Sequence, residues 1–153
     1  DECMTQRHWV QNEEVMLVTS VTSNRKPLFA NPLHARIAVE GIYHIQERQP
    51  FFMYAFVVMP DHCHLLLSVP SNGTVSKLVY AYKRYVSFEM CAGPVWQKRY
   101  HCRLIRDVIA AREYIHDNPV KAGMCQKQQD YRWSSACGKW DITRFDGMGS
   151  YES

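Results

Sequence analysis

Apolar positions along this chain follow two periods, and together they predict a mixed α+β fold. Three runs rich in apolar and β-branched residues predict buried strands, and a short fourth strand is expected within 96–105. The three runs cover residues 15–22, 51–59 and 62–69. Pro60 and Asp61 separate the last two runs, so these two strands should form a hairpin.

Apolar residues at helical spacing predict three helices between and after the strands. The helices are expected over residues 31 or 32 to 48, 75–91 and 108–117. Asp107 is a start signal for the third helix. Pro119 should end that helix near Asn118, because proline lacks the N–H that would continue it.

The order of these elements is strand, helix, strand, strand, helix, strand, followed by one more helix. This order is that of a ferredoxin-like α+β sandwich with an antiparallel βαββαβ sheet and an added C-terminal helix. The 153 residues predict a single domain over 1–153. Its core is expected over about 15–125, followed by a docking segment and tail over 126–153.

Two histidines open the second strand of the predicted hairpin. Side chains alternate faces along a strand, so His62 and His64 should point the same way while Cys63 points into the core. Two imidazoles on one face can hold a metal ion. A histidine pair alone is a weak signal, because structural histidines are common.

The third predicted helix carries the second half of a candidate site. Tyr114 and Asn118 are four residues apart and therefore share one helix face. If this face lies over the histidines, one ion is held by His62, His64 and the Asn118 amide oxygen, a ligand set that suits Mg²⁺ or Mn²⁺. Tyr114 would be the nucleophile that attacks a phosphodiester. Asn118 has an alternative role, since an asparagine before a proline can cap a new helical turn.

Composition limits the function classes without choosing one. The net charge of +3 permits a nucleic-acid partner but does not require one. No apolar run approaches the roughly 20 residues of a membrane span, and the N-terminus lacks an apolar signal region. The six cysteines show no paired spacing, which predicts free thiols and a cytoplasmic protein.

Several motifs carry a family resemblance. The segment Val58-Met59-Pro60-Asp61-His62-Cys63-His64-Leu65-Leu66-Leu67 resembles the His-hydrophobic-His motif of single-tyrosine HUH transposases. Trp96-Gln97-Lys98-Arg99-Tyr100, Tyr114-Ile115-His116-Asp117-Asn118-Pro119-Val120-Lys121-Ala122-Gly123 and Tyr131-Arg132-Trp133-Ser134-Ser135 look like the branch associated with repetitive extragenic palindromic (REP) DNA. The chain departs from the family at Cys63, where bulkier residues are common, and at Asp61, where many relatives have asparagine.

The resemblance implies a DNA-processing enzyme. By that resemblance, His62, His64 and Asn118 match the metal ligands and Tyr114 the nucleophile of a metal-dependent single-strand endonuclease and strand transferase. The expected substrate is hairpin DNA, and the product is a 5′-phosphotyrosyl enzyme with a free 3′-OH. Asn118 is one methylene shorter than the glutamine of other single-tyrosine transposases. The resemblance further implies a bacterial, nucleoid-associated protein, as a monomer or a homodimer.

Basic and aromatic residues suggest where DNA would lie. A phosphate track is expected from the basic residues near the predicted site. They are Arg25, Lys26, Lys83, Arg84, Lys98, Arg99 and Arg103. Exposed aromatic rings could stack on bases, and the candidates are Tyr80, Tyr82, Tyr85, Trp96 and Tyr100. A solvated basic face and a set of core aromatics would look the same in the sequence.

Two other functions remain open at this point. A domesticated relative would bind hairpin DNA without cutting it. A metal-dependent hydrolase would use activated water and would not need Tyr114. His116 is expected at the surface or facing DNA, because it points away from the Tyr114 and Asn118 face of the helix.

Overall fold

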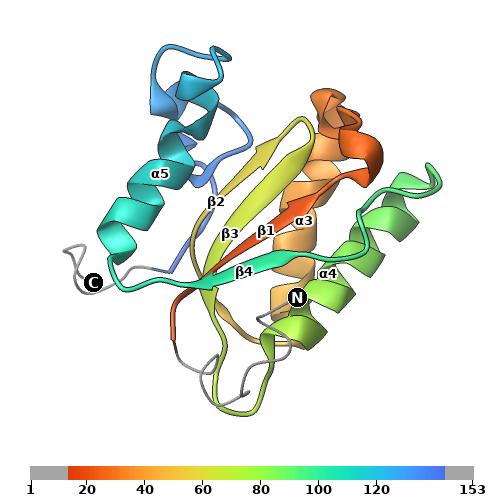
Figure 1. Cartoon of the computed structure of the whole chain (residues 1–153), viewed down its shortest axis with the longest axis vertical. Coiled ribbons are helices and arrows are strands. Elements are labelled where there is room, and N and C mark those ends of the chain that lie inside the picture. Colours follow the sequence, from red (N-terminus) through yellow and green to blue (C-terminus); the bar gives the residue numbers. More distant parts are fainter. Residues whose placement is uncertain (1–13, 144–153) are drawn as a thin grey trace.

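A computed structural model describes residues 14–143 of the chain (Figure 1). Four antiparallel strands form one sheet in the order β2-β3-β1-β4. They are β1 (Met16–Val21), β2 (Phe52–Met59), β3 (His62–Ser68) and β4 (His101–Leu104). The helices are α3 (Pro32–Arg48), α4 (Val75–Met90) and α5 (Val108–Lys121). This order and connectivity confirm the predicted ferredoxin-like sandwich with an added helix.

The two faces of the sheet are covered differently. Helices α3 and α4 pack together on one face, whereas α5 lies on the other, beside β2 and β3 (Figure 1). Cys63 points toward the α3 and α4 layer, where it is fully buried and contacts Tyr82. Burial raises the pKa of the Cys63 thiol to about 12, which makes it an inert core residue.

The predicted helix starts are confirmed by side-chain caps. Asn31 accepts a hydrogen bond from the Leu33 N–H before α3, and Thr74 accepts one from Lys77 before α4. Asp107 accepts one from the Ala110 N–H before α5. The last of these caps fixes where α5 begins, and hence where Tyr114 falls on it.

The predicted end of the third helix is wrong. Helix α5 continues through Pro119 to Lys121. Its end is set by Gly123, whose φ of 75° allows the N–H groups of Gly123 and Met124 to reach the carbonyls of Val120 and Pro119. Pro119 lacks an N–H, but the turn at Gly123 supplies hydrogen bonds to the last carbonyl groups of the helix, those of Pro119 and Val120. Asn118 therefore lies inside the helix and caps no new turn.

The segment after α5 returns along the free edge of β2. The Val58 N–H donates to the Trp133 carbonyl (2.8 Å), and the Thr143 N–H donates to the Met53 carbonyl (2.7 Å). The buried Tyr131 hydroxyl donates to the Val58 carbonyl (2.7 Å). An otherwise open sheet edge is thus covered by this segment.

Membrane helices and cysteines can be compared with the expectations for the chain. No helix within residues 14–143 is long and apolar enough to cross a membrane. Cys63, Cys91, Cys125 and Cys137 are free thiols as predicted, but Cys102 is disulfide-bonded, so the prediction of free thiols throughout is wrong. Cys3 lies outside the described residues.

Candidate active site

The two strand histidines form one paired group. Their ring centroids are 4.9 Å apart. Each ring has its Nδ1 occupied: His62 by the Asp61 carboxylate (2.8 Å) and His64 by the Thr19 hydroxyl (2.7 Å). Neither Nε2 atom has a hydrogen-bond partner among residues 14–143, so both are left for a ligand. Nδ1 partners of this kind orient metal-binding histidines.

Burial sets the charge of this pair. His64 is 6% exposed, and burial lowers its pKa to about 4, helped by the nearby charges of His62 and Arg103. The ring is therefore neutral at physiological pH, the form that binds metal. Partial burial raises the pKa of Asp61, but the hydrogen bond to His62 and the charges of His62 and Arg25 outweigh this effect and lower it. Where many relatives have asparagine, Asp61 thus gives His62 an anionic partner.

Tyr114 stands over the histidine pair from α5. Its ring packs edge-on against His64, with 5.5 Å between the ring centroids. The side chain is 49% exposed, and its hydroxyl has no hydrogen-bond partner among residues 14–143. The predicted approach of the third helix to the histidines therefore occurs within one chain.

Asn118 follows Tyr114 by one helical turn. Helix α5 runs antiparallel to β3 (Figure 1), so the turn from Tyr114 leads toward the His62 end of the strand. Four helical residues advance about 6 Å, and two strand residues advance about 6.7 Å. Asn118 is therefore expected level with His62. Within the described part of the chain no group of three His, Cys, Asp or Glu side chains is placed to hold a metal ion.

A cleft of about 700 Å³ opens beside this group on the β1 and β4 half of the sheet. Tyr114 and His64 form one wall, and Arg99, His101 and Arg103 lie on the other. The cleft therefore brings two predicted cations to the candidate nucleophile. An anionic ligand would be drawn into it.

Sequence reasoning missed two residues of this cleft, Thr19 and His101. In the sheet, Thr19 stands opposite His64 on one side and His101 on the other. Nothing in the local sequence marks either residue. Only the pairing of β1 with both neighbours, inferred from the βαββαβ order, would have placed the three on one row.

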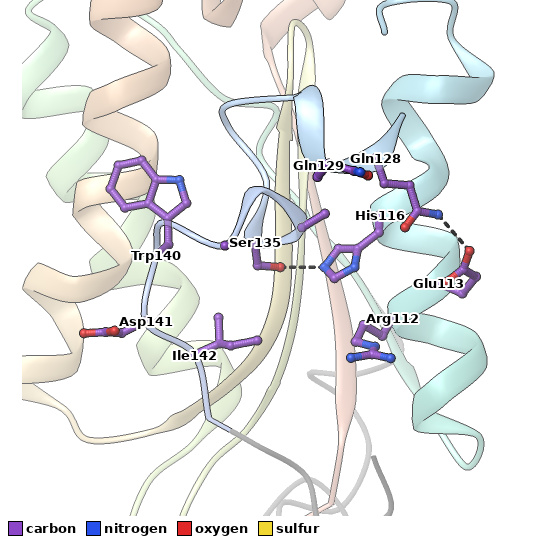
Figure 2. Close-up of a pocket in the computed structure, with 11 residues that line it drawn as sticks. Arg112, Glu113, His116, Gln128, Gln129, Ser135, Trp140, Asp141 and Ile142 are labelled. Atoms are coloured by element: carbon purple, nitrogen blue, oxygen red, sulfur yellow. Dashed lines mark hydrogen bonds between the residues drawn. The ribbon is translucent and has the colours of Figure 1, made fainter. Parts of the chain in front are cut away.

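The opposite side of α5 is a separate region (Figure 2). A pocket of about 600 Å³ lies there, lined by Arg112, Glu113 and His116 and by the C-terminal segment. His116 is 8% exposed and hydrogen-bonds to the Ser135 hydroxyl (2.7 Å), so its predicted place at the surface is wrong. A docking segment was expected within residues 126–153, but its contact with His116 was not predicted.

The other predicted DNA-contact residues are distributed over two places. Exposed Arg25 pairs with Asp61 (3.3 Å), and exposed Lys26 follows it at the His62 end. Lys83 is not free, because its ammonium donates to the carbonyls of Gln97 and Arg99 (2.8 and 3.3 Å). Burial lowers the pKa of Lys83 accordingly. Arg84 and Lys98 line a second pocket on the α4 side of the sheet edge.

The fold and this site define a ferredoxin-like protein with a helix tyrosine set against a strand histidine pair. The sequence profile of the family described as "Transposase IS200 like" matches residues 11–118. The chain belongs to the IS200-like transposase family.

Two curated relatives agree with this assignment. A protein of Haemophilus influenzae, described as a candidate REP-associated tyrosine transposase, is 31% identical over 58% of this chain and 61% of its own length. The REP-associated tyrosine transposase of Escherichia coli K12 is 27% identical over 62% of this chain and 60% of its own. The chain thus spans about three fifths of these relatives.

Solved structures show the same fold. A structure described as the REP-associated tyrosine transposase bound to a REP hairpin has a TM-score of 0.73. It is 22% identical and covers 93% of this chain and 94% of that chain. A structure of a candidate transposase from Deinococcus radiodurans R1 has a TM-score of 0.55, 22% identity, and coverage of 73% and 95%.

Proposed function

We propose that this chain is a single-strand DNA endonuclease and strand transferase that acts at hairpin or palindromic DNA. The observation that carries the proposal is the 5.5 Å approach of the exposed Tyr114 ring to buried His64, at the mouth of a basic cleft. Family membership supports transposase chemistry, and the hairpin is suggested by the partner named for the structural neighbour.

The histidine pair fits a divalent ion, Mg²⁺ or Mn²⁺. Both Nε2 atoms are left by the Nδ1 hydrogen bonds, and His64 is neutral. His62, His64 and Asn118 would hold the ion, since Asn118 has no hydrogen bond from its side chain within the described range. A bound divalent ion would polarise a phosphodiester and offset its charge.

Tyr114 then supplies the nucleophile. Its hydroxyl oxygen attacks the phosphorus, the bond from phosphorus to the 3′ oxygen breaks, and the phenolic proton ends on that oxygen by way of water. The products are a 5′-phosphotyrosyl enzyme and a free 3′-OH. A 3′-OH can attack the phosphotyrosyl bond in turn, so rejoining needs no nucleotide cofactor.

The basic residues would position the DNA. Arg99 and Arg103 lie in the cleft and would contact phosphates nearest the scissile bond. Arg25 and Lys26 would contact the strand at the His62 end, and Lys98 and Arg84 beyond the sheet edge. Lys83 would contribute by holding the 97–99 backbone in place. Such a substrate implies a cytoplasmic, nucleoid-associated protein.

The nuclease proposal is tested by a covalent adduct. Hairpin oligonucleotides taken from palindromic repeats in the flanking genome are mixed with the protein and Mn²⁺ or Mg²⁺, then run on a denaturing gel. We expect a shifted band that disappears with EDTA and in Tyr114→Phe. An adduct in Tyr114→Phe would overturn the nucleophile assignment. Tight hairpin binding without any adduct would instead identify a domesticated DNA-binding protein.

A further inference from the structure

A second concave site lies around the sheet edge from the cleft, against α4. It has a volume of about 330 Å³, at the lower end of the range for small-ligand pockets. Its lining combines the Tyr80 ring with the cations Arg84 and Lys98. No carboxylate among the described residues lines it. The pocket thus offers an aromatic face and positive charge together.

The structure separates Tyr80 from the other aromatic candidates for stacking. Tyr82 is 1% exposed and donates its hydroxyl to the Ala38 carbonyl, and Tyr85 stacks on His44. Trp96 is partly buried and packs against Phe29. Tyr80 is 66% exposed, and its hydroxyl accepts a hydrogen bond from Arg84 (3.4 Å). Tyr80 is therefore a free ring held beside a cation.

The pocket adjoins the candidate active site. Tyr100 lines both the pocket and the cleft, and the consecutive residues Lys98 and Arg99 face one site each. Tyr100 is 6% exposed, and its hydroxyl is buried without a partner among residues 14–143. A strand that leaves the cleft over residues 98–100 would reach Tyr80 next.

We propose that this pocket seats one unpaired nucleobase of the DNA strand that enters the cleft. The base would stack on Tyr80, and its phosphate would lie between Arg84 and Lys98. A paired base cannot fill the site, because both of its faces are covered within a duplex. The proposal rests on the proposed function and adds to it a contact that would set where the DNA is cut.

An abasic scan tests this inference. Binding of fluorescent hairpin oligonucleotides with single-stranded flanks is measured in Tyr114→Phe, which is not expected to cut, with one flank base removed at a time. We expect one position whose loss weakens binding roughly tenfold. The double variant Tyr114→Phe, Tyr80→Ala should bind the intact oligonucleotide more weakly by the same factor. It should bind the oligonucleotide that lacks this one base as tightly as Tyr114→Phe does. Tyr80→Phe, which keeps the ring, should bind as the parent does.

Phe88→Ala is the matched control, since Phe88 is a 75% exposed ring on the same helix but outside the pocket. If Tyr80→Ala binds as tightly as Phe88→Ala, this inference is overturned while the proposed function stands. Binding that is unchanged at every abasic position would also overturn it, because an abasic site keeps its phosphate and the contact would then be with the DNA backbone only. A parent protein that binds no hairpin oligonucleotide would overturn the proposed function, and this inference with it.

Discussion

The two sides of α5 hold their site residues, Tyr114 and His116, in opposite states of exposure. On one side, Tyr114 is half exposed over His64, and its hydroxyl faces an open cleft. On the other, His116 is buried and bonded to Ser135 (Figure 2). Tyr114 and His116 are only two positions apart in the sequence. One face of α5 therefore packs against the C-terminal segment, and the other exposes Tyr114, the candidate nucleophile, to the cleft.

The comparison assigns different roles to two buried histidines. His64 lies on the cleft side, and no residue within 14–143 hydrogen-bonds to its Nε2, whereas the Nε2 of His116 bonds to Ser135 on the sealed side. Burial lowers the pKa of both to about 4. Burial and a shifted pKa do not by themselves distinguish a ligand from a structural residue; the position of His64 at the cleft, beside His62, does.

The largest expected effect comes from His64→Ala. Loss of one imidazole ligand should reduce metal-dependent adduct formation by at least about 100-fold. His116→Ala, on the sealed side, should keep adduct formation in the folded fraction and lower stability instead. Gel assays and thermal melting on both variants check this pair. Equal adduct loss in the two folded variants would contradict the division between the sides.

Thr19→Val tests the cleft side without removing a proposed metal ligand. The variant leaves the His64 Nδ1 without its hydroxyl partner, so the ring loses its orientation. We expect apparent Mn²⁺ affinity in the adduct assay to fall by about 10- to 100-fold. Thr19→Ser, which retains the hydroxyl, should stay near the wild type. Unchanged metal affinity in Thr19→Val would show that the Thr19 hydroxyl does not orient His64 for metal binding.

Ser135→Ala tests the sealed side. The Ser135 hydroxyl accepts from the buried Phe56 N–H (3.0 Å) and bonds to His116, so the variant leaves both groups without a partner. The free energy of unfolding should fall by about 2 kcal/mol. Denaturant titration measures it, with Tyr114→Phe as a control expected to unfold like the wild type. A loss below about 0.5 kcal/mol would show that the C-terminal segment docks without this bond.

The last test is a pH dependence of stability that His116 contributes, spread over more than two pH units. Burial, with the charge of Arg112, lowers its pKa to about 4 against the opposing charge of Glu113. Between about pH 4 and the ordinary value of 6.5 the unfolded chain binds a proton that the folded chain does not. Stability should therefore fall as pH drops through this window, by up to about 3 kcal/mol from this residue. His116→Gln should flatten the slope between pH 7 and 4.5 in denaturant titrations, and an unchanged slope would contradict it.

Local sequence patterns were enough to predict much of this fold. The strand runs, the caps Asn31 and Asp107 and the Pro60-Asp61 turn lie within a few residues of the structure they produce. The i, i+4 spacing of Tyr114 and Asn118 put both on one helix face. The approach of this face to the histidines was only a condition of the predicted site, and the structure brings the Tyr114 ring to His64.

What the sequence did not show depends on contacts between distant residues. Thr19 became a partner of His64 through strand register, and Lys83 was bound by the backbone of residues 97–99. His116 was buried by a segment about 20 residues further along the chain. The end of α5 was mispredicted because Gly123 closes the helix after Pro119. None of these contacts leaves a periodic or compositional signal.

The central claim is that one chain brings Tyr114 to its own histidine pair. Mixing His64→Ala with Tyr114→Phe tests it most directly, because a tyrosine that served a partner's histidines would restore one intact site in the mixture. The account predicts no adduct from the mixture, while wild-type protein diluted to the same concentration of intact sites forms it. An adduct that returns on mixing would contradict the arrangement within one chain.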